Sequence, residues 1–239
     1  MNAGSGRRRI PVRRLARWLI LGTALSASVA PAFAQAAPAW PDTFESRVEA
    51  LALMQTLNAD ILGSSSATLT LEKWCRDHRM ADEPAIMARL VEGIDKAPTA
   101  EQLQRLRVSR RDQVQYRRVE LRCGAHVLSE ADNWYVPSRL TAAMNARLKS
   151  SDTPFGKVVQ PLGPYRRTVD IRILWSPLPE GWEQQRQPPR PPAASGVLAI
   201  PAALFEHRAV LYTRDHRPFS EVVETYQGEI LAFPRSPQF

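Results

Sequence analysis

Apolar residues recur at helical spacing in the first part of the chain that shows a regular pattern. From Phe44 to Ile61 they follow three or four positions apart, until Gly63 and a serine run end the stripe. Asp42-Thr-Phe-Glu45 has the form of a capping box, which predicts that a helix begins there. Two further helices are expected, one over Leu69–Met80 and one opening at the capping box Thr99-Ala-Glu-Gln102.

From Gln113 onwards the chain is rich in β-forming residues. Val114–Cys123 and His126–Val136, joined by the turn Gly124-Ala125, predict an antiparallel hairpin. The other expected elements are strands over Ile86–Val91 and Tyr165–Trp175, an amphipathic helix over Ser138–Ser150, and a terminal hairpin of Glu206–Thr213 and Pro218–Tyr226. Helices packed on one face of an antiparallel sheet, an α+β fold, is the simplest architecture for this order.

The first 34 residues predict an export signal. They hold six arginines and no acidic residue, then a short apolar stretch, then Pro31-Ala-Phe-Ala34, an A-x-A cleavage pattern. The apolar stretch is about thirteen residues, whereas a membrane span needs about twenty. We expect cleavage after Ala34, a periplasmic location without stable membrane insertion, and one domain over residues 35–239. An uncleaved membrane anchor is the alternative.

Most of the net positive charge of the chain comes from this N-terminal segment. The formal net charge is +8, but without residues 1–34 there remain 26 basic and 24 acidic residues. This near balance indicates no general affinity for nucleic acid. The content of 44% hydrophobic and 23% charged residues excludes a disordered chain and a polytopic membrane protein.

Other features leave alternatives open. Cys75 and Cys123 are the two cysteines: export permits a disulfide, whereas the alternation of Cys123 with apolar residues is typical of a buried thiol. The spacing of the four histidines predicts no metal site. Residues 177–195 form a proline-rich loop around Pro188–Pro192, either a plain surface insertion or a recognition segment.

Three segments carry candidate binding or catalytic groups. Strand alternation places Arg118 on a polar face, where its guanidinium could clamp a carboxylate or simply face solvent. Asp152-Thr-Pro-Phe-Gly156 predicts a helix start, with Thr153 as N-cap and Pro154 first in the helix. The amides of Phe155 and Gly156 would then be free for an anion, unless the segment is a plain turn. Glu224 alternates with Val222 and Tyr226, and a desolvated carboxyl there could act as a general acid, although a half-exposed strand glutamate is commoner.

Tyr116–Gly124, Asn133–Pro137 and Asp152–Gly156 together resemble the chorismate pyruvate-lyase family in order and spacing. The resemblance covers roughly residues 44–230. It implies an antiparallel sheet of about six strands, with helical flaps over an internal ligand cavity. In that family chorismate is split into 4-hydroxybenzoate and pyruvate without a metal or organic cofactor. The same fold serves GntR-type transcription regulators as a small-molecule effector domain.

The resemblance also implies roles for individual residues. Arg118 falls on an arginine that holds a substrate carboxylate, Phe155 on a backbone donor, and Glu224 on the acid, with Glu221 as a lesser candidate in a second alignment. Asn133 stands where the family has a second arginine, a loss for which Arg122 or Arg139 could compensate. We therefore expect a lyase-like enzyme acting on a small aromatic or cyclohexadienyl carboxylate. The alternative, favoured by Asn133 and by export, is a non-catalytic binding protein on the same fold.

Overall fold

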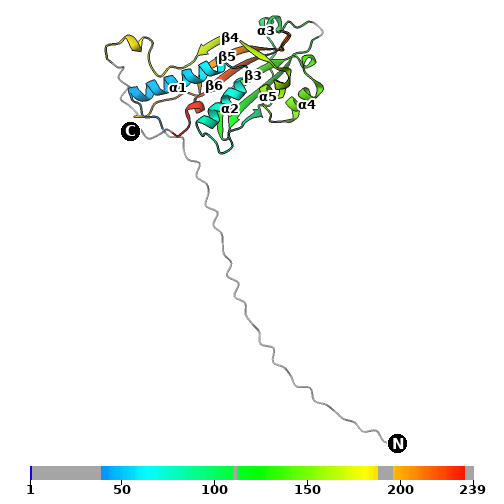
Figure 1. Cartoon of the computed structure of the whole chain (residues 1–239), viewed down its shortest axis with the longest axis horizontal. Coiled ribbons are helices and arrows are strands. Elements are labelled where there is room, and N and C mark those ends of the chain that lie inside the picture. Colours follow the sequence, from blue (N-terminus) through cyan, green and yellow to red (C-terminus); the bar gives the residue numbers. More distant parts are fainter. Residues whose placement is uncertain (2–38, 110–111, 188–195, 235–239) are drawn as a thin grey trace. The chain divides into compact units, whose positions relative to one another are not determined.

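Six strands pair into one antiparallel sheet in the order β1-β2-β3-β6-β5-β4 (Figure 1). The structure is a computed structural model that describes residues 1, 39–109, 112–187 and 196–234. The strands are β1 (Ile86–Leu90), β2 (Gln115–Cys123), β3 (His126–Tyr135), β4 (Tyr165–Ile173), β5 (Ala203–Tyr212) and β6 (Pro218–Gln227). The predicted α+β fold with a six-stranded antiparallel sheet is confirmed.

Four of the five α-helices among the described residues begin where a threonine or serine side chain accepts a backbone N–H. The helices are α1 (Phe44–Leu62), α2 (Ala67–Asp77), α3 (Ala100–Arg105), α4 (Ala142–Ser150) and α5 (Phe155–Val159), with 3₁₀ turns at Pro137–Arg139, Gln160–Leu162, Trp182–Gln184 and Gly228–Leu231. The capping box of Thr99 and Gln102 is present. Thr43, not Asp42, caps α1, since its hydroxyl accepts the amide of Ser46 at 3.1 Å. Thr141 likewise caps α4, so that helix begins after the predicted Ser138.

The two faces of the sheet are covered differently. One face carries α1 and α2, and α5 packs against both α2 and α4. The core lies beneath α1 and α2, where Met54, Leu57, Ile61 and Leu71 are fully buried. The segment that ends in α3 lies against the opposite face, because its Arg105 binds Glu221 of β6 there.

A disulfide links Cys75 of α2 to Cys123 at the end of β2, with a Cα–Cα distance of 6.1 Å. Of the two alternatives that the sequence left open, the structure shows the disulfide and not the free core thiol. Both half-cystines are fully buried, so alternation with apolar residues could not distinguish the two states. The bridge ties a helix of the covering layer to a strand of the sheet.

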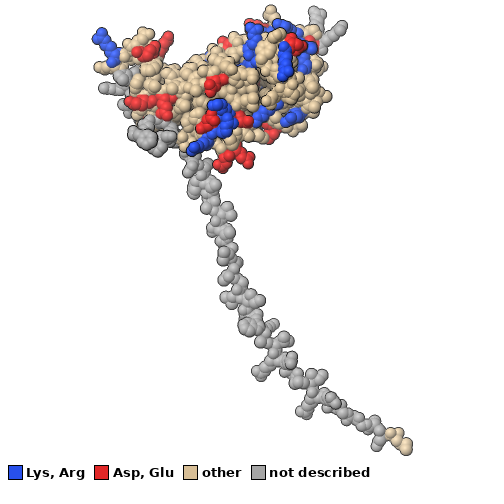
Figure 2. All heavy atoms as spheres, viewed as in Figure 1, with Lys and Arg blue, Asp and Glu red and all other residues tan. Residues whose placement is uncertain are grey.

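Charged side chains of both signs are interspersed on the face of the protein shown in Figure 2. Residues Ala36–Phe239 form one compact unit. Within the described ranges, no helix is long and apolar enough to cross a membrane. Residues 2–34 of the predicted export signal and the Pro188–Pro192 run lie outside the described residues.

Candidate functional site

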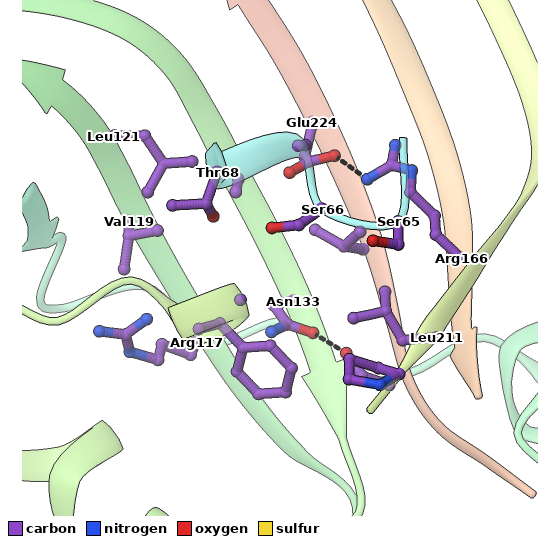
Figure 3. A pocket seen from close by; sticks show the side chains of 17 residues that line it. Ser65, Ser66, Thr68, Arg117, Val119, Leu121, Asn133, Arg166, Leu211 and Glu224 are labelled. Atoms are coloured by element: carbon purple, nitrogen blue, oxygen red, sulfur yellow. Dashed lines mark hydrogen bonds and ion pairs between the residues drawn. The ribbon is translucent and has the colours of Figure 1, made fainter. Parts of the chain in front are cut away.

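A pocket lies between the sheet and the start of two helices (Figure 3). Its floor comes from β2, β3, β6, β5 and β4, and its roof from the start of α2, from α5 and from Pro164. It holds about 620 Å³ of empty space, counted with its open mouth. The lining residues are Ser65, Ser66, Ala67, Thr68, Arg117, Val119, Leu121, Ala131, Asn133, Phe155, Gly156, Pro164, Arg166, Leu211, Ser220, Val222 and Glu224.

The arginine that β2 turns into the pocket is Arg117, which shares the inner face with Val119 and Leu121. Arg118, the predicted carboxylate clamp, does not line this pocket, because strand alternation turns it to the opposite face. There Arg118 forms a short ion pair with Glu130 and lies 3.6 Å from Asp132.

Arg117 is buried and unpaired. The residue is 6% exposed, and its Nε and Nη2 atoms have no hydrogen-bond partner. No acidic side chain within the described ranges forms an ion pair with it. Burial lowers the pKa of Arg117, because a guanidinium in an apolar surrounding loses its hydration. A charge left in this state favours an anionic ligand.

A second buried arginine, Arg166 of β4, faces the same pocket and is paired. Its Nη1 lies 2.5 Å from Oε2 of Glu224, and the two side chains are 4% and 7% exposed. Burial opposes the charge of Arg166, but the Glu224 carboxylate outweighs it and raises the pKa of the guanidinium. Glu224 also accepts a hydrogen bond from the Tyr226 hydroxyl at 3.1 Å. Nε and Nη2 of Arg166 have no partner, so two donors remain free.

Asn133 supplies a neutral polar group to the floor. Its Oδ1 accepts a hydrogen bond from Oγ of Ser220 at 2.5 Å. Its amide nitrogen points away from the dashed line that marks this bond (Figure 3). The amide nitrogen therefore remains as a donor for a ligand. Arg166 provides a second cationic side chain in the pocket, although it comes from a different strand than the family resemblance implied.

The roof is closed by a tight approach of α5 to the start of α2. A Cβ added at Gly156 would lie 2.9 Å from Oγ1 of Thr68 and 3.1 Å from Oγ of Ser66, so a side chain there would force these hydroxyls to move. Phe155 packs its ring on Tyr135 and Phe219, with centroids 5.6 and 6.3 Å away.

The structure brings Phe155, Gly156, Asn133 and Glu224 together in one pocket; their roles toward a ligand remain predictions. One local detail differs. Pro154, not Thr153, is the N-cap of α5, and Phe155 is its first residue.

The remaining candidates lie elsewhere. Glu221 is fully buried on the opposite face, where Arg105 donates two hydrogen bonds of 2.8 Å to its carboxylate. Arg122 pairs with Glu120, and Arg139 donates to the carbonyls of Leu106 and Pro218. None of these side chains can replace a pocket arginine.

His207 lies behind the pocket on β5, opposite Glu224 of β6. It is fully buried, and its Nε2 lies 2.7 Å from Oδ1 of Asn58 on α1. Burial, together with the positive charge of Arg166, lowers its pKa to about 4. The imidazole is therefore neutral at physiological pH and adds no charge beside the Arg166–Glu224 pair.

The arrangement combines two buried guanidinium groups, one carboxylate and an apolar floor, which suits a small anionic ligand with an apolar body. Among the described residues, no group of three or more metal-ligating side chains could hold a metal ion. Sequence reasoning missed Arg117 although a signal existed: it shares strand parity with Val119 and Leu121. For Arg166 no motif gave such a signal.

No family model matches the sequence. Solved structures with a partial likeness include PhnF from Mycobacterium smegmatis, with 14% identity over 74% of this chain and 70% of that one, at a TM-score of 0.44. The effector domain of the same protein matches with 14% identity over 69% and 90%, at 0.42. The effector-binding domain of the Bacillus subtilis trehalose repressor matches with 10% identity over 64% and 96%, at 0.35. Likeness at this level identifies neither a ligand nor an activity.

The sequence itself has a much nearer relative. "Uncharacterized protein y4mC" of Sinorhizobium fredii is 49% identical over 196 residues, which cover 82% of each chain. Identity of this extent along the length of both chains means common descent and a common fold. The chain belongs to the same family as y4mC.

Proposed function

We propose that the protein binds a small aromatic carboxylate in the pocket, as a chorismate lyase-like domain. The observation that carries this proposal is Arg117, a buried guanidinium with unpaired donors that faces a mostly apolar cavity. A carboxylate is the planar anion that such a fork binds with two parallel hydrogen bonds. The floor residues Val119, Leu121 and Val222 and the ring of Phe155 supply the apolar surface for the body of the ligand.

The test is a thermal-shift titration of the purified protein with benzoate and 4-hydroxybenzoate. Benzamide and 4-hydroxybenzamide serve as uncharged controls of the same shape. We expect the acids, and not the amides, to raise the midpoint, because ligand at 100 times its Kd adds about 2.7 kcal/mol to stability. Equal stabilisation by acids and amides would show that the pocket does not select a carboxylate.

A matched pair of variants assigns the anion to one side chain. Arg117→Met should weaken binding of the acids by about 2–5 kcal/mol, since a buried charge partner is lost. Arg118→Met removes the neighbouring charge on the opposite face and should leave the affinity unchanged. The reverse outcome would restore the original expectation for Arg118.

A second function is favoured by Glu224, which lies in the same cavity as Arg117. We propose that it transfers the proton that accompanies cleavage of the carbon–oxygen bond of an enolpyruvyl ether such as chorismate. Incubation with chorismate, followed by chromatography for 4-hydroxybenzoate, tests this reaction. Product that depends on Glu224 would support the lyase, whereas binding without product would leave a receptor.

Export is proposed on the sequence pattern alone. It favours the receptor, because chorismate is a cytosolic metabolite. Mass spectrometry of the N-terminus from fractionated cells should find a periplasmic chain that begins at Gln35. A cytosolic species with intact Met1 or Asn2 would contradict export and would favour the enzyme.

A further inference from the structure

One end of the sheet is exposed in a way that the pocket does not explain. β4 is the last strand, and no described residue pairs with its outer edge (Figure 1). The other end, β1, is partly covered, because the amide of Ala88 donates to the carbonyl of Asp152 at 2.7 Å. Every residue from Val169 to Ile173 is exposed. An open strand edge of this kind is a template for another strand.

Three of the five exposed residues from Val169 to Ile173 are apolar. Val169, Ile171 and Ile173 are 47%, 42% and 46% exposed. The register against β5 shifts between Thr168 and Asp170 and is regular from there to Ile173. A regular, partly apolar edge segment thus follows the bulge. Exposed apolar residues grouped on one edge mark an interaction surface.

The backbone of this segment is oriented for pairing. Leu174 continues the register of β4 opposite Leu204, and its amide donates to the carbonyl of Leu204 at 2.9 Å. The amide of Trp175, beyond the end of the strand, donates to the same carbonyl at 3.0 Å. Since backbone groups alternate along a strand, Ile173 and Ile171 turn their N–H and C=O groups to the open edge. These unpaired groups can be satisfied by an incoming strand.

We propose that β4 pairs antiparallel with β4 of a second copy of this chain, about a two-fold axis at Ile171. In this register Ile171 lies opposite its own copy, and Asp170 of each chain lies opposite Arg172 of the other. A shift of the axis to Asp170 or Arg172 would bring like charges face to face, which destabilises a strand pair. The segment is therefore complementary to itself in charge in this one arrangement.

Among the described residues, no tight ion pair holds Asp170 or Arg172 within its own chain, so both charges are available to a second copy. Arg172 has a side chain that is 62% exposed and lies 3.5 Å from Glu206, a loose surface pair. Asp170 lies opposite Arg208 in the sheet. A two-strand interface is small, so we expect a reversible dimer with a Kd on the order of 10 µM.

Sedimentation velocity of the full chain from about 2 to 200 µM should show this dimer. Asp170→Arg and Arg172→Asp should each weaken it about thirtyfold, because each places two like-charge pairs across the axis. An equimolar mixture of the two variants should dimerise again, since each chain then meets the opposite charges. A wild-type chain that stays monomeric throughout this range would overturn the proposal. A mixture that stays monomeric while the wild type dimerises would overturn the register.

A cysteine on the axis tests the same register covalently. The two native cysteines are bridged, so Ile171→Cys would carry the one free thiol among the described residues. Directly paired residues have Cα atoms about 5.5 Å apart, within reach of a disulfide. Ile171→Cys should therefore form a cross-linked dimer on mild oxidation, and Arg172→Cys should not. Equal cross-linking at both positions would overturn the proposal, and circular dichroism confirms that the variants are folded.

Discussion

Arg117 should make the ligand-free protein less stable than a variant that lacks this buried charge. Its side chain is buried, and Nε and Nη2 have no partner. A buried polar donor left unpaired costs about 1–3 kcal/mol, and more when it is charged. Arg117→Met keeps an unbranched side chain of similar length and removes these donors. We expect the variant to be more stable: its free energy of unfolding should exceed that of the wild type by about 1–3 kcal/mol, after allowance for packing lost by the substitution.

The assay is urea unfolding followed by circular dichroism, without ligand. For a domain of this size, 1 kcal/mol corresponds to about 2–4 °C in Tm, so a thermal scan should rise by several degrees. Arg118→Met is the matched control: it removes a partly exposed pair with Glu130 and should cost about 1 kcal/mol. Cooperative unfolding of Arg117→Met at a lower free energy than the wild type would refute the reasoning, because it would mean that the native guanidinium is satisfied.

Three further predictions concern stability. Glu221→Gln should cost roughly 2–3 kcal/mol in urea unfolding, less than a fully buried pair, because Arg105 is 27% exposed. His207 should make the wild type lose up to about 3 kcal/mol as pH falls from 6.5 to 4, because its pKa is lowered to about 4 and the unfolded chain takes up the proton first. His207→Gln should flatten that part of the pH profile. Reduction of Cys75–Cys123 should cost about 4 kcal/mol, since the bridge closes a loop of 48 residues.

Each of these predictions has a clear contrary result. Unchanged stability of Glu221→Gln would mean that the ion pair contributes nothing beyond its desolvation cost. A pH profile of His207→Gln as steep as that of the wild type would assign the acid sensitivity to other groups. Equal urea midpoints with and without reductant would mean that the bridge does not constrain the unfolded chain.

Local signals in the sequence were sufficient for most elements of the fold. The capping box at Thr99 and the turn at Gly124, which has a φ of 54°, define a helix start and the β2–β3 hairpin directly. The strand order could not be predicted, because β6 inserts between β3 and β5 through contacts distant in sequence. The disulfide was open for the same reason: it depends on how α2 lies on the sheet, which no local pattern encodes.

The sequence indicated which segments form the pocket, but not which arginines face it. The segments with Asn133, Phe155 and Glu224 meet in one pocket, but the guanidinium beside them belongs to Arg117. Two adjacent arginines differ only in strand parity, and the resemblance pointed to Arg118, which faces away from the pocket. Arg166 comes from a strand interrupted by a bulge between Thr168 and Asp170, where alternation cannot be followed through. Its role follows from packing alone.

The position of the disulfide relates stability to the pocket. Cys75 lies on α2, whose start at Ser66–Thr68 roofs the cavity, and Cys123 ends β2, which carries Arg117 on the floor. The unpaired charge of Arg117 works against closure of these two layers, since water would solvate it better than the protein does. The disulfide between α2 and β2 holds the two layers together even though the charge of Arg117 is not neutralised. The pocket can thus hold an unpaired guanidinium ready for a ligand while the surrounding fold stays closed.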